Sequence, residues 1–119
     1  MANNDTLKIG NKNFKNRLML GTGKYKTPNL MVDSLQSSNC EIVTVAVRRV
    51  KSDTEKENLM QYIDWSKYWM LPNTAGCTNS DEAIRIAMLG RELAKLSGQE
   101  NNNFVKLEVI PDKKYLLPD

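Results

Sequence analysis

Histidine is absent from this 119-residue sequence, and cysteine occurs only at Cys40 and Cys77. A chain without histidine has no Ser-His or Cys-His nucleophile, and it lacks the ligand used in most zinc sites. The two cysteines stand in neither a metal-binding nor a redox spacing, so the sequence leaves open two unpaired thiols in a reducing compartment or one disulfide. We therefore expect no metal site and no cofactor.

The sequence also lacks any apolar run near the ~20 residues that a membrane span requires. Its first residues resemble neither a signal peptide nor an arginine-rich transit peptide. We expect a cytoplasmic protein, or one of the plastid stroma if it is plastid-encoded. The net charge is +3, and the densest basic run, Arg48-Arg49-Val50-Lys51, is short. Neither a membrane nor a nucleic acid is therefore an expected partner.

What the sequence does have is the composition of an ordinary globular domain. Hydrophobic residues make up 40% of the chain and charged residues 26%, which argues against disorder. A chain of this length has room for one domain. We therefore assign residues 1–119 to a single domain.

Helices and strands are expected to alternate along the chain. Thr27 is the expected cap of a helix that begins with Pro28, and Asn79 with Glu82 resembles a capping box. The β-branched run at 41–47 predicts a strand covered on both sides. The expected elements are a hairpin at 7–14, strands at 17–20, 41–47, 68–71 and 104–110, helices at 27–39, 59–63 and 79–97, a glycine loop at 21–23 and a mobile loop at 51–58.

Some residues inside these elements predict how the elements pack and where they end. Gly90 lies mid-helix, where glycine costs roughly 1 kcal/mol relative to alanine, so we expect close packing against a strand there. Pro72 is expected to end the third strand, and Gly98 is expected to end the last helix. The first helix is expected to turn three side chains inward: Leu30, Met31 and Leu35.

The order of elements predicts the fold class. A hairpin followed by β, α, β, α, β, α, β is typical of a parallel sheet with right-handed crossovers. Such units in sufficient number close into a (β/α)₈ barrel, which normally takes ~250 residues. We therefore predict an α/β fold of the TIM-barrel type, to which this chain supplies the N-terminal hairpin and roughly the first four βα units.

The last expected strand carries Lys106 and Glu108 on one face, because alternate residues of a strand point the same way. If both faces are buried, this pair lies in the interior, where unpaired charge is costly. Burial favours the free amine of a lysine, which attacks carbonyl groups, whereas a neighbouring carboxylate favours the ammonium form. An antiparallel strand with one solvated face is the alternative.

Several blocks of the sequence resemble thiazole synthase of thiamine (vitamin B1) biosynthesis, in the family's order and over nearly the whole chain. These blocks are Leu20-Gly21-Thr22-Gly23-Lys24-Tyr25, Glu41-Ile42-Val43-Thr44-Val45-Ala46-Val47-Arg48-Arg49, Leu71-Pro72-Asn73-Thr74-Ala75-Gly76-Cys77, Asp81-Glu82-Ala83-Ile84-Arg85, Val105-Lys106-Leu107-Glu108-Val109-Ile110 and Leu116-Leu117-Pro118-Asp119. The family's chain is about twice as long, which matches a complete barrel. The resemblance implies that residues 1–119 are the N-terminal portion of one such barrel domain.

The resemblance implies an enzyme, a sulfur-transferring transferase. The family condenses 1-deoxy-D-xylulose 5-phosphate, dehydroglycine and sulfur from the thiocarboxylate of a small sulfur carrier protein into thiazole phosphate, and it forms homotetramers. Its motif places the lysine that forms an imine (Schiff base) at Lys106 and an acidic proton shuttle at Glu108. Both would project into the barrel near the C-terminal end of the fourth strand. Another Schiff-base aldolase on a related barrel is the runner-up enzyme.

Three residues near the expected active end are candidates for substrate binding: Gly21, Gly23 and Arg48. A plain βα turn explains the glycines equally well, and an exposed arginine at a loop start is the ordinary alternative for Arg48. Cys77 is expected to be a small buried thiol. Three aromatic residues are expected in the core or at a subunit interface: Trp65, Tyr68 and Trp69.

The family's phosphate grip comes from later βα loops, which have no counterpart in these residues. The chain as printed keeps the nucleophile without the phosphate cradle, and a half barrel leaves strand edges open to pairing. The alternative function is therefore a truncated, catalytically incomplete fragment that self-associates or pairs with a separate C-terminal half.

Overall fold

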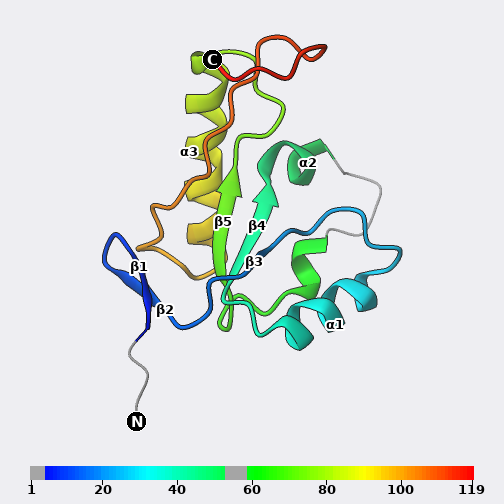
Figure 1. Cartoon of the computed structure of the whole chain (residues 1–119), viewed down its shortest axis with the longest axis vertical. Coiled ribbons are helices and arrows are strands. Elements are labelled where there is room, and N and C mark those ends of the chain that lie inside the picture. Colours follow the sequence, from blue (N-terminus) through cyan, green and yellow to red (C-terminus); the bar gives the residue numbers. More distant parts are fainter. Residues whose placement is uncertain (1–4, 53–58) are drawn as a thin grey trace.

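The computed structural model describes residues 5–52 and 59–119. Strands and helices alternate, as the sequence predicts (Figure 1). The elements are β1 (Leu7–Ile9), β2 (Lys12–Phe14), β3 (Met19–Leu20), α1 (Pro28–Ser38), β4 (Ile42–Ala46), α2 (Val47–Ser52), the 3₁₀ helix η1 (Leu59–Tyr62), β5 (Trp69–Asn73) and α3 (Ser80–Leu96).

The strands form a hairpin and a parallel sheet. β1 and β2 pair antiparallel, and β3, β4 and β5 form a three-stranded sheet in that order, with parallel neighbours. The predicted hairpin and the predicted parallel α/β arrangement are therefore confirmed. The short span of β3 follows from Asn16, whose side chain accepts a hydrogen bond from the Leu18 amide, and from the bends at residues 22–24.

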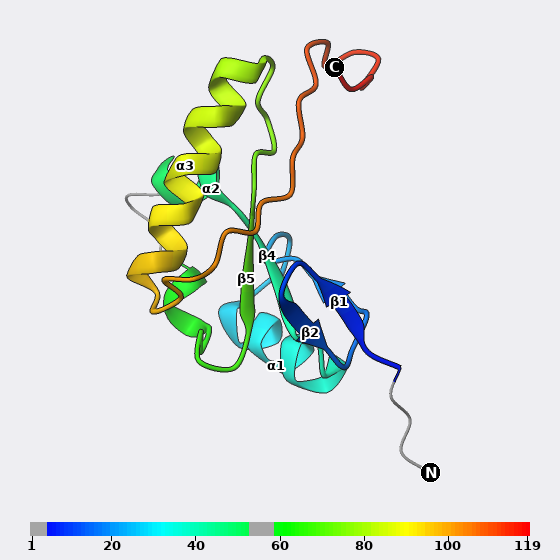
Figure 2. The same ribbon diagram turned by 90° about the vertical axis from the view of Figure 1, so that its left-hand side faces the viewer.

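The two faces of the sheet carry different cores. Figure 2 shows α3 and the hairpin on opposite sides of β4 and β5. Val43 and Val45 of β4 face the helical side, where Val43 packs with Met31 and Leu35 of α1. The other face holds a set that we call the hairpin cluster, made of Phe14, Ile42, Leu71, Leu7, Ile9, Trp69 and Phe104. Alternation along the strands thus separates a helical face from a hairpin face.

Helix α1 begins as predicted. The Thr27 hydroxyl accepts a hydrogen bond from the Leu30 amide at 3.1 Å, and Pro28 occupies the first turn. Met31 and Leu35 are buried, but Leu30 is 48% exposed, so its predicted inward position is wrong. Leu30 lies ~100° around the helix from Met31 and therefore off the buried stripe.

Helix α3 packs tightly on β5. Asn79 caps it by accepting a hydrogen bond from the Glu82 amide, and Gly98 has the positive φ of a residue that ends a helix, so the predicted cap and helix end are confirmed. The predicted capping box is not complete, because the Glu82 carboxylate accepts from the Thr78 amide and not from the Asn79 amide. At Gly90 a Cβ atom would lie 2.7 Å from Cβ of Pro72 and 3.3 Å from Cγ2 of Val47. The predicted close approach of this helix to a strand is therefore confirmed.

Two sequence predictions about element ends are wrong. Residues 47–52 form the helix α2, where the end of a strand and the start of a loop were expected. The short helix expected at 59–63 is present as the 3₁₀ helix η1. β5 continues through Pro72 to Asn73. Both cysteines are free thiols, which excludes the disulfide alternative. The rest of the loop expected at 51–58, residues 53–58, lies outside the described residues.

The expected strand at 104–110 is reduced to a single parallel bridge between Asn73 and Lys106. Proline lacks an amide hydrogen, so Pro72 cannot donate the ladder bond that would precede this bridge. The Asn102 side chain instead donates to the Met70 carbonyl at 2.7 Å and accepts from the Phe104 amide at 2.9 Å. Side chains thus replace the ladder on the N-terminal side of Lys106.

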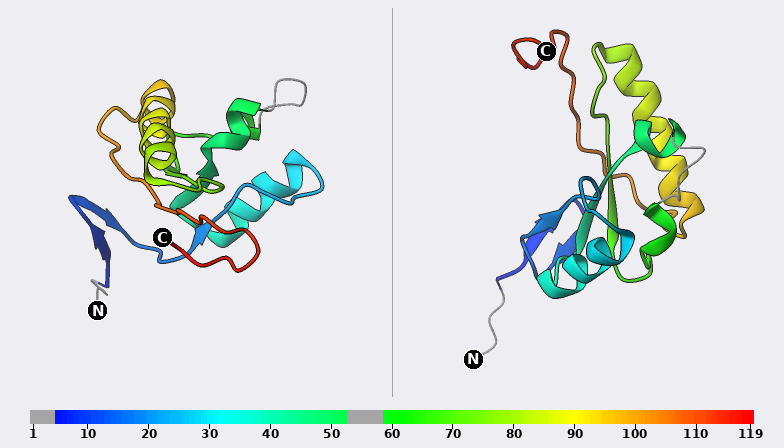
Figure 3. Two further views of the ribbon diagram at one scale, coloured as in Figure 1. Left: turned by 90° about the horizontal axis from the view of Figure 1, so that it is seen from above. Right: turned by 90° about the vertical axis from the view of Figure 1, so that its right-hand side faces the viewer.

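The described helices include none that is both long and apolar enough to cross a membrane. The segment after α3 passes β5 and leads to the C-terminal residues, at the opposite end of the molecule from the N-terminus (Figures 1 and 3). The C-terminal ends of the strands and this segment therefore meet at one end of the sheet.

Candidate active site

The candidate residues gather where the parallel strands end. Gly21 follows β3, Arg48 follows β4, the turn at residues 74–77 follows β5, and Lys106 lies beside the last residue of β5 (Figure 1). The carboxyl ends of parallel strands are the usual place for binding and catalysis in such sheets.

Strand register places Lys106 on the hairpin face of the sheet. Its amide donates to the Pro72 carbonyl at 2.8 Å, and its carbonyl accepts from the Thr74 amide at 3.2 Å. Lys106 is therefore level with Asn73, two residues beyond Leu71 of the hairpin cluster, and alternate residues of a strand share a face. Lys106 is exposed, so the burial expected for both faces of its strand is absent in this chain.

Beyond Lys106 the pairing passes from backbone to side chains. In a regular parallel ladder the Glu108 amide would bond the Thr74 carbonyl, and the Gly76 amide would bond the Glu108 carbonyl. Here the Thr74 carbonyl accepts from the Cys77 amide and closes a turn. The Thr74 hydroxyl replaces both ladder partners of Glu108. It accepts from the Glu108 amide at 2.8 Å in place of the Thr74 carbonyl, and it donates to the Glu108 carbonyl at 2.7 Å in place of the Gly76 amide.

The Glu108 carboxylate is aimed at the same turn. Its Oε2 accepts from the Gly76 amide at 3.0 Å. Among the described residues no ion pair joins it to Lys106. Gly76 has φ +91°, which favours glycine, and a Cβ there would lie 2.8 Å from a guanidinium nitrogen of Arg48. The turn is thus shaped to present its amide to Glu108.

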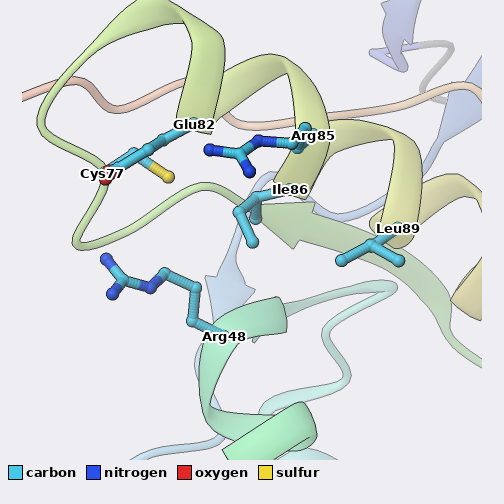
Figure 4. Close-up of a pocket in the computed structure, with 6 residues that line it drawn as sticks. All are labelled: Arg48, Cys77, Glu82, Arg85, Ile86 and Leu89. Atoms are coloured by element: carbon cyan, nitrogen blue, oxygen red, sulfur yellow. The ribbon is translucent and has the colours of Figure 1, made fainter.

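Arg48 anchors the other side of this turn. Its guanidinium donates to the Gly76 carbonyl and lines a pocket of about 240 Å³ with Cys77, Glu82, Arg85, Ile86 and Leu89 (Figure 4). Arg48 is therefore an exposed residue of a helix, and it donates a hydrogen bond to a loop carbonyl. Substrate binding by Arg48 stays a prediction. In Figure 4 the guanidinium extends toward the Cys77 loop.

Cys77 is a buried thiol, as predicted, with 0% of its side chain exposed. Burial raises the pKa of this thiol, and the neighbouring Arg48 opposes that shift. The Glu82 carboxylate in the same pocket accepts from the Thr78 amide, and this bond lowers the pKa of Glu82. The thiol is therefore held in its neutral form.

The two glycines are exposed at the end of β3. A Cβ at Gly21 would lie 3.5 Å from the Thr44 hydroxyl, and one at Gly23 would lie 3.3 Å from a guanidinium nitrogen of Arg49. The intervening Thr22 hydroxyl donates to the Thr44 carbonyl at 3.2 Å. The structure brings Gly21 to the active end of the sheet, and substrate binding by both glycines stays a prediction.

Comparison with known proteins decides the family. A family model described as the thiazole biosynthesis protein ThiG matches residues 8–119. The chain belongs to the ThiG family. The thiazole synthase of Prochlorococcus marinus strain MIT 9312 is 71% identical over 119 residues, which are 100% of this chain and 45% of that protein. The thiazole synthase of Prochlorococcus marinus strain NATL1A is 68% identical over 117 residues, 98% of this chain and 44% of that protein.

The family resemblance that the sequence blocks predict is thereby confirmed. This ThiG-family chain spans about 45% of the length of the curated relatives, and the match covers all of its own residues. Among the described residues no cluster of His, Cys, Asp and Glu could hold a metal ion.

The residues that hold the lysine–glutamate pair, Asn73 and Thr74, are not among the candidates that the sequence predicts. Thr74 is fully buried, and Asn73 is 7% exposed at the bridge with Lys106. The block Pro72-Asn73-Thr74-Ala75-Gly76 did carry a signal, because a buried strand that ends in small polar residues and glycine favours side-chain to backbone bonds. Its partner at Glu108 is far along the chain, and local spacing does not reveal it.

Proposed function

We propose that the whole protein to which these residues belong is a thiazole synthase that uses Lys106 as its imine-forming nucleophile. The family match supports the reaction class, and the names of the relatives give the activity. The observation that carries the residue assignment is the bridge between Lys106 and Asn73, which sets the lysine on the hairpin face at the active end of the sheet. The three proposed reactants are 1-deoxy-D-xylulose 5-phosphate, dehydroglycine and the thiocarboxylate of a sulfur carrier protein.

In the first proposed step, the free amine of Lys106 adds to the substrate ketone. The resulting carbinolamine loses water, so that the C=O bond is replaced by a C=N bond to the lysine nitrogen. The Glu108 carboxylate then takes a proton from a carbon beside the iminium, which leaves an enamine, and can return that proton to a neighbouring atom. Glu108 thus ends each shuttle in the carboxylate form in which it began.

Lys106 is exposed in this chain, whereas imine chemistry in an enzyme normally takes place in a site closed to bulk water. We propose that the sheet is the first part of a (β/α)₈ barrel whose remaining strands cover the hairpin face. A hollow on that face supports this, with a volume of about 940 Å³ and a lining that includes Met19, Ile42, Leu71 and Phe104. Barrel closure would convert this face into the interior.

The other assignments are proposals as well. Gly21 and Gly23 would let the substrate approach the loop after β3, and Arg48 would meet anionic groups while it holds the Gly76 carbonyl. A homo-oligomer, a tetramer by family resemblance, would add subunit contacts. The proposed location is the cytoplasm, or the plastid stroma for a plastid-encoded protein.

A product assay tests this function. The protein is incubated with the three proposed reactants, and thiazole phosphate is detected by mass spectrometry. We expect product with the native protein and with Lys113→Arg, a matched control at an exposed lysine, and none with Lys106→Arg. Consumption of 1-deoxy-D-xylulose 5-phosphate that does not depend on the sulfur carrier and yields no thiazole phosphate would instead support the runner-up, a Schiff-base aldolase of another kind.

A second candidate follows from the share of the relatives that the chain covers, 45%. A chain of these residues alone would be a catalytically incomplete fragment that self-associates or pairs with a separate C-terminal half. Intact mass of the protein purified from its source decides between them. A mass near 13.5 kDa favours the fragment, and a mass about twice as large favours the enzyme.

A further inference from the structure

We propose that Thr74 is a positioning residue for Glu108, an inference that rests on the proposed function for its catalytic consequence but not for its geometry. The Thr74 hydroxyl is bonded to both the amide and the carbonyl of Glu108, at 2.8 and 2.7 Å. These are the two backbone groups that flank the Glu108 side chain. Thr74 therefore fixes the point from which the carboxylate projects.

The surroundings of Thr74 explain how a single hydroxyl can do this. Its side chain has 0% exposure, so water does not compete for the two bonds. Its own amide donates to the Lys106 carbonyl at 3.2 Å, and its carbonyl accepts from the Cys77 amide at 3.1 Å. One residue thus ties the nucleophile segment, the acidic residue and the turn after β5 into one network.

The turn completes the positioning. The Gly76 amide donates to Oε2 of Glu108 at 3.0 Å, and Arg48 holds the Gly76 carbonyl from the far side. If the Glu108 backbone shifts, the carboxylate loses its alignment with the Gly76 amide as well. Lys106 is held separately, because its backbone bonds go to Pro72 and to the Thr74 main chain. Loss of the Thr74 hydroxyl should therefore disturb Glu108 more than Lys106.

Side-chain substitutions separate the hydroxyl from the shape of the residue. Thr74→Val keeps the volume and removes both bonds, whereas Thr74→Ser keeps the hydroxyl. Thr78→Val is the matched control, because Thr78 also loses a hydroxyl bond, to Glu82 at 3.3 Å, but it does not touch Glu108. Amide hydrogen exchange is measured in the 119-residue chain for all four proteins. We expect at least tenfold faster exchange at Glu108 and Gly76 in Thr74→Val only.

The catalytic consequence is measured in the active protein as two separate rates. Borohydride trapping of the ketone substrate reports imine formation at Lys106, and exchange of deuterium beside the ketone reports proton transfer. We expect Thr74→Val to trap within about twofold of the native protein while its deuterium exchange falls at least tenfold. Thr74→Ser should restore exchange to within about threefold. The double variant Thr74→Val/Glu108→Gln should be no slower than Glu108→Gln.

The outcomes distinguish the two claims. If the native protein traps no substrate, the proposed function fails, and the amide exchange data alone decide the role of Thr74. Unchanged exchange at Gly76 in Thr74→Val overturns the positioning role whatever the enzyme does. The positioning role is also overturned if the fold-losses in deuterium exchange of Thr74→Val and Glu108→Gln multiply in the double variant, because Thr74 would then act independently of Glu108. Equal losses of trapping and deuterium exchange would show a general structural role instead.

Discussion

Replacement of Gly90 by alanine should destabilise this chain, although alanine is normally the better helix residue. In an unobstructed helix interior the change would stabilise the protein by about 0.5–1 kcal/mol. Here the new Cβ would lie 2.7 Å from Cβ of Pro72, well inside the closest ordinary contact. Relief requires movement of α3 away from β5, since both nearby atoms of Pro72 are in a rigid ring.

The size of the effect follows from these opposing terms. Overpacking in a core typically costs about 1–3 kcal/mol, which exceeds the helix gain. We expect a net loss of about 1 kcal/mol in the free energy of unfolding. Urea titration followed by tryptophan fluorescence measures it, because Trp69 is the first residue of β5 and Trp65 lies just before that strand.

A double-mutant cycle gives the control. Pro72→Gly removes the opposing Cβ, so Gly90→Ala in that background should be neutral or stabilising. The coupling free energy between the two sites should be about 1–2 kcal/mol, within the range found for residues in direct contact. If Gly90→Ala stabilises the native chain by about 1 kcal/mol, as it would in an open helix, the close contact between α3 and β5 is refuted.

Two further predictions use other residues of the same region. Asn79→Ala should lower the free energy of unfolding by about 1 kcal/mol by removing the cap of α3, and Asn79→Asp should not; equal urea midpoints would contradict this. Burial raises the pKa of the Cys77 thiol in the folded protein above its pKa in the unfolded chain, which is ~8.5. The stability that the neutral thiol contributes is therefore complete below the unfolded pKa and is lost as pH rises through the folded pKa. Cys77→Ala should therefore show a smaller alkaline loss of stability than the native chain; an equal loss in both would show that Cys77 is not its source.

The parts of the fold that the sequence predicts are those fixed by nearby residues. Thr27 and Asn79 cap their helices through bonds to residues three positions on, which a reader can count in the sequence. The buried strand β4 is marked by its β-branched run. Gly90 signals a close contact because glycine is otherwise costly in a helix.

The parts that the sequence does not predict depend on distant partners. α2 has no apolar spacing or cap that marks it, and it follows β4 directly. Pro72 is normally a strand end, yet it lies inside β5, because the Asn102 side chain bonds Met70 and Phe104 where the backbone ladder before Lys106 would otherwise run. The Thr74 hydroxyl likewise replaces a backbone ladder bond, so the pairing of Lys106 is limited to one bridge.

The candidate site shows the same division. The family blocks point to Lys106 and Glu108 from the sequence alone, and the structure brings them to the active end of the sheet. The bonds that hold Glu108 come from residues 32 and 34 positions away, Gly76 and Thr74. Local spacing does not identify partners that lie more than 30 positions apart in the chain.

The most direct test of the central claim is to identify the residue that forms the imine. The protein is incubated with 1-deoxy-D-xylulose 5-phosphate, reduced with borohydride, digested and mapped by mass spectrometry. We expect one modified peptide, which contains Lys106, and its loss in Lys106→Arg but not in Lys113→Arg. An adduct at another lysine, or no adduct in a protein that still makes thiazole phosphate, would contradict it.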